Sequence, residues 1–323
     1  VFDPEQLTLP EMLQARGYRT ACIGKWHLGW DWSALRNEDV KAVKKGRRSE
    51  LPPNAFDWSK AIPDGPLAHG FDHYFGDDVP NFPPYTWIED DRVLTAPPRS
   101  HVPPPKPPEG SAECRPGPGV EGWRLDAVMP ELERRAVDWL RAQRDSEQPF
   151  FLYLPFTSPH APIVPTEAFT GVSEAGPYGD FVAQTDATVG AVLDTLDELG
   201  LAENTIVVFT ADNGPEHYAY ERVRRGDHRS MGELRGLKRD VFEGGHRVPF
   251  LVRWPGRISA GRVSDDLIGQ VDLMATFATL TGADLPDETA EDSFDLTPLL
   301  HGEGSSGRTT IVHNTFAKSW ALR

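Results

Sequence analysis

The sequence contains few cysteines and no long apolar run. Cys22 and Cys114 are its only cysteines, too few for a disulfide framework, and neither lies in a Cys-x-x-Cys or Cys/His zinc pattern. No stretch is long and apolar enough to cross a bilayer, so no membrane span is predicted. The first residues, Val-Phe-Asp-Pro-Glu-Gln, do not resemble an export signal. We interpret Val1 as a cut point, so any targeting segment is expected upstream.

Positive charge is also scarce. Lysine and arginine together number 33 against 49 aspartates and glutamates, which gives a formal net charge of −16. Binding to a phosphate backbone needs clustered cations, so this balance argues against a nucleic-acid partner. Any anionic substrate must therefore be held by a few local cations. The 323 residues are enough for one large α/β domain or for two ordinary domains.

Amphipathic segments alternate with short apolar or β-branched segments along most of the chain. The pattern predicts helices over residues 10–16, around 132–140 and over 189–196, and strands over 18–23, 150–155, 205–210 and 250–254. This alternation favours an α/β fold, with a large, mostly parallel sheet that has helices on both faces and functional residues at the carboxyl ends of its strands.

Two segments interrupt the alternation. Residues 31–66 are polar and uneven, and residues 93–122 are rich in proline and glycine, so both are predicted to be long surface loops. Within the second loop, Pro103–Pro108 is interpreted as a solvated excursion, although a proline-binding partner remains an alternative. The aromatic residues near the expected site are interpreted as packing anchors more readily than as platforms for a sugar or aryl ring; they are Trp30, Trp32, Tyr85 and Trp87.

Three loop residues are candidates for binding an anion and moving protons. Lys25 and His27 are two apart in an extended segment, so both side chains would project to one side of the backbone and suit an anion. From the spacing alone, a solvated lysine and a histidine that caps a loop are favoured over an anion site. His160 follows the second predicted strand, 150–155, between two prolines and is a candidate acid or base, although a lone loop histidine is usually structural.

Two later segments offer ligands for a cation and a further cation for an anion. Asp212 and Asn213 supply hard oxygen donors at a strand end, as Ca²⁺ or Mg²⁺ prefers, although Asp-Asn-Gly is also an ordinary turn. Lys238 lies in a glycine-containing, highly charged stretch that precedes Glu243-Gly244-Gly245. We expect Lys238, like the other candidates, to lie in a loop at a strand end.

The order of these segments resembles the type I sulfatases, which are formylglycine-dependent and calcium-dependent enzymes of the alkaline phosphatase superfamily. The resemblance runs from Leu7 to the last residues. Its most specific motifs are Gly-Lys-Trp-His-Leu-Gly at 24–29, Asp-Asn-Gly at 212–214 and Glu-Gly-Gly-x-Arg-Val-Pro at 243–249. Supporting motifs are Gly-Phe-Asp-x-x-Phe-Gly at 70–76, Ser-Pro-His at 158–160 and Val-Asp-Leu-Met at 271–274.

The resemblance implies one Ca²⁺ site in which Asp212 and Asn213 are ligands and the remaining ligands lie upstream of Val1. It also implies a formylglycine, made from a cysteine in Cys-x-Pro-Ser-Arg, upstream of the Gly-Lys-Trp-His segment. Cys22 is followed by Ile-Gly-Lys and Cys114 by Arg-Pro-Gly-Pro, so neither matches. Residues 1–310 are therefore expected to be a catalytic domain without its N-terminal strand and nucleophile segment, and 311–323 to begin a small C-terminal domain that is largely missing.

The implied activity is hydrolysis of an aryl or carbohydrate sulfate ester. Lys25, His160 and Lys238 would bind the sulfate group, His160 or Lys238 would assist the leaving alcohol, and His27 would act as a base. The 323 residues by themselves are expected to be inactive, and the resemblance makes a periplasmic or secreted location plausible. A phosphate or phosphonate ester hydrolase of the same superfamily and a non-catalytic anion-binding domain are the alternatives; the single pair of calcium-type ligands favours the sulfatase.

Overall fold

The computed structural model describes residues 5–45, 48–101, 109, 114–226, 228–315 and 318–323, and it contains two units, residues 1–195 and 196–323. The helices are α1 (Leu9–Ala15), α2 (Val128–Arg141), α3 (Gly176–Glu198), α4 (Tyr218–Arg225), α5 (Glu243–His246), α6 (Asp272–Thr281) and α7 (Thr297–His301). The strands of the first unit are β1 (Arg19–Ile23), β2 (Val43–Lys45), β3 (Arg48–Glu50), β4 (His73–Gly76), β5 (Ile88–Glu89), β6 (Arg92–Val93), β7 (Arg99–His101), β8 (Gly117–Gly119) and β9 (Phe150–Tyr153). Those of the second are β10 (Val207–Thr210), β11 (Phe250–Arg253), β12 (Val312–Asn314) and β13 (Trp320–Leu322).

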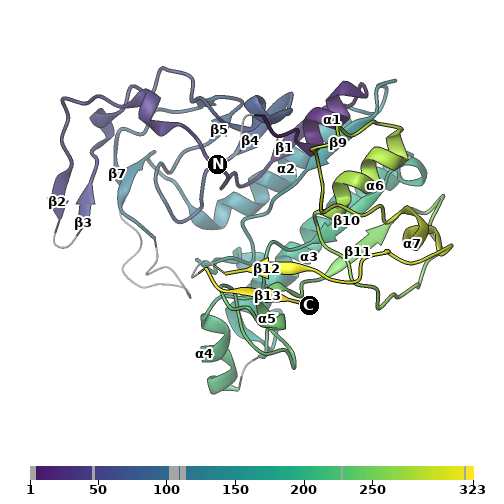
Figure 1. Ribbon diagram of the computed structural model, residues 1–323. Helices are drawn as coiled ribbons and strands as arrows, with labels where there is room; N and C mark the ends of the chain where they lie inside the picture. Colours follow the sequence, from purple (N-terminus) through teal and green to yellow (C-terminus); the bar gives the residue numbers. More distant parts are fainter. Residues whose placement is uncertain (1–4, 46–47, 102–108, 110–113, 227, 316–317) are drawn as a thin grey trace. The chain divides into compact units, whose positions relative to one another are not determined.

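A five-stranded sheet with the order β6-β5-β4-β1-β9 organises the first unit (Figure 1). Its central strand β1 pairs in parallel with β4 and β9, whereas β5 and β6 extend the sheet in antiparallel fashion beyond β4. Because the three parallel strands run the same way, their carboxyl ends lie at one edge. The predicted α/β fold with a parallel sheet at its centre is confirmed.

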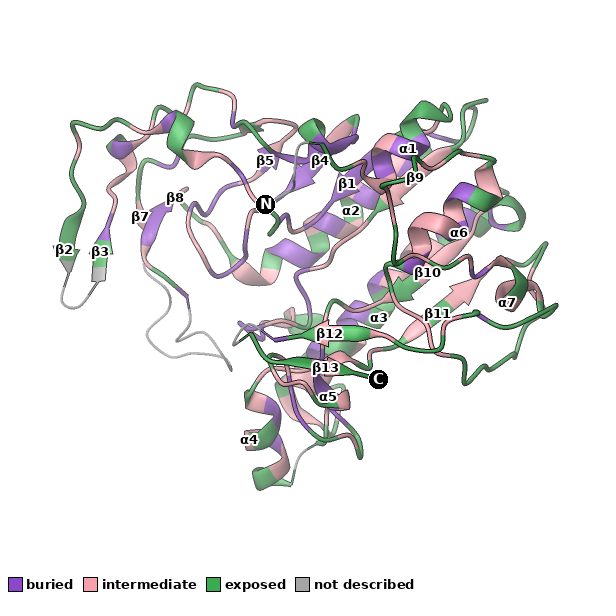
Figure 2. Ribbon diagram, in the orientation of Figure 1, coloured by how far each residue is buried: buried purple, intermediate pink, exposed green. Residues whose placement is uncertain are grey.

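The side chains of β1 and β4 alternate between the two faces of the sheet. Ile23 and Phe75 pack against α2, whose Leu132 and Ala136 are fully buried, as the purple stripe on that helix shows (Figure 2). Cys22 and Tyr74 point to the other face and join a second hydrophobic cluster. This period of two, with both faces buried, explains why Ala21–Ile23 and Tyr74–Phe75 place apolar side chains on both faces of the sheet.

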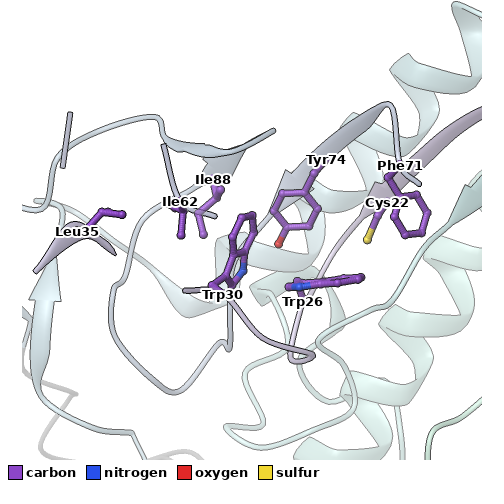
Figure 3. Packing of buried hydrophobic residues seen from close by; sticks show 8 residues of the cluster. All are labelled: Cys22, Trp26, Trp30, Leu35, Ile62, Phe71, Tyr74 and Ile88. Atoms are coloured by element: carbon purple, nitrogen blue, oxygen red, sulfur yellow. The ribbon is translucent and has the colours of Figure 1, made fainter. Parts of the chain in front are cut away.

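Residues 31–66 form much of the cover on that second face, so the prediction of a surface loop was only partly right. Leu35 and Ile62 are buried in the cluster with Trp30, Tyr74 and others, as Figure 3 shows. The Trp30 and Tyr74 rings meet edge to face with their centroids 5.5 Å apart. The segment has no long helix or strand among its described residues, and its scattered aromatic and aliphatic side chains carry no periodicity that the sequence could reveal.

The proline-rich segment 93–122 contains a short antiparallel pair, β7 with β8. Tyr85 packs against this pair and is 2% exposed, and Trp30 is 8% exposed, so the interpretation of these two aromatics as packing anchors is confirmed. Pro103–Pro108 lies outside the described residues, and its interpretation stays a prediction.

The second unit contains an antiparallel pair, β10 with β11, and not the parallel pair that the alternating pattern favoured.

A buried ion pair anchors the later part of the second unit: Arg308 donates to the carboxylate of Asp272, which also accepts from the backbone N–H groups of Gly269 and Phe294. Residues 311–323 include the β12–β13 hairpin, and His313 Nε2 lies 3.0 Å from the carbonyl oxygen of Val241. That a small C-terminal domain begins in this segment stays a prediction.

The predicted and observed helix boundaries differ most for α3. The apolar pattern predicted it only over 189–196, but the helix begins at Gly176. Its first half buries Asp180, Gln184 and Thr185, polar side chains that produce no hydrophobic period. Among the helices of the described segments, none combines the length and apolar character that spanning a membrane requires.

Tyr74 ties two loops of the sheet edge together, which allows a direct test. Its buried hydroxyl lies 2.9 Å from the carbonyl oxygens of both Gly24 and Asp77. Tyr74→Phe should therefore lower the free energy of unfolding of the first unit by about 1–3 kcal/mol, since it leaves buried acceptors without their donor. Urea denaturation measures this, with Tyr220→Phe at an exposed position as the control. Equal stability of Tyr74→Phe and the unchanged chain would contradict the assigned role.

Candidate functional site

The segment that carries Lys25 and His27 is bonded on both sides at the carboxyl edge of the parallel strands. Gly24 N–H donates to the Phe75 carbonyl at 2.8 Å, and Trp26 N–H to the Asp77 carbonyl at 3.2 Å. On the other side, Lys25 N–H donates to the Pro155 carbonyl at 2.9 Å. The backbone of this segment is thus fixed between the loops that follow β4 and β9.

This close approach requires a glycine at position 76. A Cβ at Gly76 would lie 1.8 Å from the carbonyl oxygen of Gly24, which is far inside van der Waals contact. The absence of that side chain allows the two strand-end loops to touch. Lys25 is half-buried in this arrangement, whereas His27 is exposed and its ring meets the edge of Phe82.

His160 lies in the loop after β9, at the same edge of the sheet. The hydroxyl of Ser158 lies 2.7 Å from that of Thr185, which anchors this loop on α3. The His160 Nδ1 atom lies 2.5 Å from the Ala161 carbonyl, which can only accept, so in the neutral ring Nδ1 carries the proton and Nε2 is the basic nitrogen. A small depression beside the ring is lined by Pro80, Leu125, Thr157, Pro162, Val164 and Phe181.

Two carboxyl groups, Asp77 and Asp78, lie beside Lys25 and were missed in the sequence. Asp77 is 2% exposed, and Trp32 donates its indole N–H to Asp78 at 3.1 Å. Burial, with the neighbouring Asp78 charge, raises the pKa of Asp77 to about 7, and burial raises the pKa of Asp78 to about 6; in both cases the Lys25 charge opposes the rise. Asp77 and Asp78 directly follow an apolar segment that ends in glycine, and this position in the sequence could have identified them as candidate site residues.

In the second unit, Asp212 and Asn213 follow the carboxyl end of β10. The Asn213 side-chain NH₂ donates to the Gly214 carbonyl at 2.9 Å, which commits the nitrogen and leaves Oδ1 as the atom suited to a cation. Asp212 is exposed. Oxygens of a carboxylate and an amide are the donors that Ca²⁺ takes, so these two residues fit part of a calcium coordination sphere. Among the described residues, no group of three or more His, Cys, Asp or Glu side chains is arranged to hold a metal.

Lys238 is joined to this turn through the backbone. Its N–H donates to the Pro215 carbonyl at 3.0 Å, and Gly214 N–H donates to the Gly245 carbonyl at 3.0 Å. A Cβ at Gly214 would lie 1.8 Å from the Gly244 carbonyl oxygen. The structure thus places the backbone of Lys238 beside the turn that carries Asp212 and Asn213.

One expectation about Lys238 was wrong. It does not follow a strand but lies in the connection between α4 and α5. Backbone hydrogen bonds to the turn after β10 place it, and charge-rich sequence around it gives no indication of those bonds. Lys25, His27 and His160 belong to the first unit and Asp212, Asn213 and Lys238 to the second. That the two sets form one site stays a prediction.

Comparison with known proteins settles the family. The Sulfatase family model matches residues 2–283. The chain belongs to the sulfatase family. It is 36% identical over 315 residues to human arylsulfatase A, covering 95% of this chain and 54% of that protein. It is 29% identical over 354 residues to an N-acetylgalactosamine-6-O-sulfatase of Bacteroides thetaiotaomicron, covering 100% of this chain and 65% of that protein. This sulfatase chain thus spans about half to two thirds of these relatives.

Solved structures agree with this assignment. A structure described for glycosaminoglycan metabolism in Bacteroides thetaiotaomicron matches with a TM-score of 0.80 and 28% identity, covering 100% of this chain and 70% of that one. The phosphonate monoester hydrolase of Agrobacterium radiobacter matches with a TM-score of 0.55 and 16% identity, covering 98% of this chain and 67% of that one. The latter likeness shows a shared fold only.

The buried acid pair makes the stability of the first unit depend on pH. Both groups have folded pKa values above the ordinary value of 3.8, so the folded state binds protons more tightly than the unfolded state. Their stabilising contribution is present below about pH 4 and is lost as the pH rises through about 6 to 7. Asp77→Asn should make the free energy of unfolding fall less between pH 4.5 and 7.5, by on the order of 2 kcal/mol. Urea unfolding at pH 4.5, 6 and 7.5 measures it, and an unchanged pH dependence in Asp77→Asn would contradict it.

Proposed function

We propose that the protein to which this chain belongs hydrolyses the sulfate ester of a carbohydrate or aryl alcohol. The observation that carries the proposal is the backbone hydrogen bond from Lys238 to Pro215, which brings the loop of an anion-binding lysine beside the turn that holds two oxygen donors for a cation, Asp212 and Asn213. Family membership and the names of the relatives support the choice of sulfate over phosphate. The carbohydrate substrate class is drawn from the N-acetylgalactosamine-6-O-sulfatase.

Each residue has a role that its chemistry suits. Asp212 and Asn213 would hold Ca²⁺, which would supply positive charge to the sulfate oxygens when bound. Lys25 and Lys238 would neutralise the charge that grows on the sulfate and the leaving oxygen in the transition state. Such groups accelerate the reaction to the extent that they bind the transition state more tightly than the substrate.

The histidines would handle protons. His160 would carry a proton on Nε2 to the departing alcohol, since its Nδ1 is committed to the Ala161 carbonyl. His27 is exposed and would serve as the base that completes the cycle. We propose that formylglycine from a segment outside these 323 residues provides the nucleophile. Cys22 is an unsuitable source, because it lies in the core and burial raises its thiol pKa well above the ordinary value.

The proposed role of Lys25 and Lys238 in binding the sulfate group is tested in a protein extended to include the nucleophile segment. Lys25→Ala and Lys238→Ala should each lower kcat/KM for p-nitrophenyl sulfate on the order of 100-fold or more, as deletion of one transition-state donor does. Lys60→Ala, which removes an exposed lysine paired to Asp57 at 4.0 Å, is the control. Turnover of p-nitrophenyl phosphate in preference to the sulfate by the unaltered protein would refute the proposed reaction.

The calcium ligands are tested by metal content in the same extended protein. Asp212→Ala should weaken Ca²⁺ binding on the order of tenfold or more, because it removes a charged ligand, and Asn213→Ala should do so less. Isothermal titration with Ca²⁺ measures both. Asp197→Ala, an exposed aspartate of the same unit that pairs with Arg253, should bind as the unaltered protein does. Undiminished affinity in Asp212→Ala would remove that residue from the coordination sphere.

A further inference from the structure

Glu216 lies three residues after Asn213, and its carboxylate contacts two cations from the Lys238 loop. Lys238 Nζ lies 3.4 Å from Oε1, and the Arg239 guanidinium donates to Oε2 at 2.7 Å. The Glu216 side chain is only 10% exposed. Each cation thus meets a different oxygen of one nearly buried carboxylate.

The backbone holds this arrangement from both ends. The Pro215 carbonyl, directly before Glu216, accepts from Lys238 N–H, so the two residues are joined through main chain as well as side chain. Arg239 adopts the left-handed conformation, φ = +80°, which non-glycine residues rarely occupy. The Leu237 N–H donates to the Asp240 carboxylate at 2.9 Å and closes the turn. These contacts fix the loop from which Lys238 and Arg239 extend.

The carboxylate of Glu216 is ionised near neutral pH. Burial alone would raise the pKa of Glu216, but the hydrogen bond from Arg239 and the charges of Lys238 and Arg239 outweigh burial and lower the pKa to about 2. Glu216 is therefore a permanent acceptor for the Lys238 ammonium group and does not act as a proton donor.

We propose that Glu216 is a positioning residue that holds the Lys238 ammonium group for the sulfate oxygens; the proposal rests on the function given above. A lysine has a flexible four-carbon stem, and ordering it costs conformational entropy. An ammonium group has three donors, so one can point to Glu216 while the others remain for an anion. Arg239 shares the carboxylate charge, which limits its competition with sulfate for Lys238.

A double-mutant cycle in the extended, calcium-loaded protein tests this. Glu216→Ala should lower kcat for p-nitrophenyl sulfate on the order of tenfold, and Glu216→Gln, which keeps an oxygen in place, should lower it less. In a Lys238→Ala background, Glu216→Ala should cause almost no further loss, because the group that it positions is gone. The control is Glu233→Ala, which breaks the exposed Arg229–Glu233 pair of the same unit and should leave kcat unchanged.

The outcomes separate the two proposals. If the unaltered protein turns over no sulfate ester, the proposed function fails. If it is active but the losses from Glu216→Ala and Lys238→Ala multiply independently, Glu216 does not act through Lys238 and the inference is overturned. Thermal unfolding of each variant is followed in parallel. The inference is also overturned if Glu216→Ala loses activity only because it unfolds while Glu216→Gln is as stable and as active as the unaltered protein.

Discussion

Contact between backbones, permitted by glycine, is the constraint on which each set of candidate residues depends. At Gly76 in the first unit and Gly214 in the second, the space that a Cβ would occupy holds a carbonyl oxygen of a neighbouring loop. Main-chain hydrogen bonds then join the loops on either side. Because the backbone of these loops is held by hydrogen bonds, the Cα positions from which the candidate side chains extend are fixed.

The polar groups beside these contacts have a common electrostatic logic. Lys25 lies next to Asp77 and Asp78, and Lys238 next to Glu216, so each candidate anion-binding lysine has a carboxyl neighbour. The pKa values of these carboxyl groups shift in opposite directions in the two units. Burial dominates in the first unit and raises the pKa of both aspartates, whereas two cations dominate around Glu216 and lower its pKa. A protein with a net charge of −16 would attract a sulfate ester only where such local cations prevail over the surrounding field.

Sequence reasoning succeeded where one local pattern determined the outcome. The strands β1, β9, β10 and β11 were predicted within about two residues, because each contains a short apolar or β-branched run. It failed where partners are distant in sequence. The polar first half of α3, the antiparallel pairing of β10 with β11 and the burial of Leu35 and Ile62 all depend on tertiary contacts. Among site residues, the motifs supplied Lys25, His27, His160, Asp212, Asn213 and Lys238, while Asp77, Asp78 and Glu216 emerged only from their contacts.

We propose that the two lysines, 213 positions apart in the sequence, bind the same sulfate group. The most direct measurement is a crystal structure of the extended protein with Ca²⁺ and inorganic sulfate. We expect one sulfate with both Lys25 Nζ and Lys238 Nζ within about 3 Å of its oxygens and with Asp212 and Asn213 on the adjacent metal. Lysines on separate anions, or on opposite faces of the protein, would contradict it.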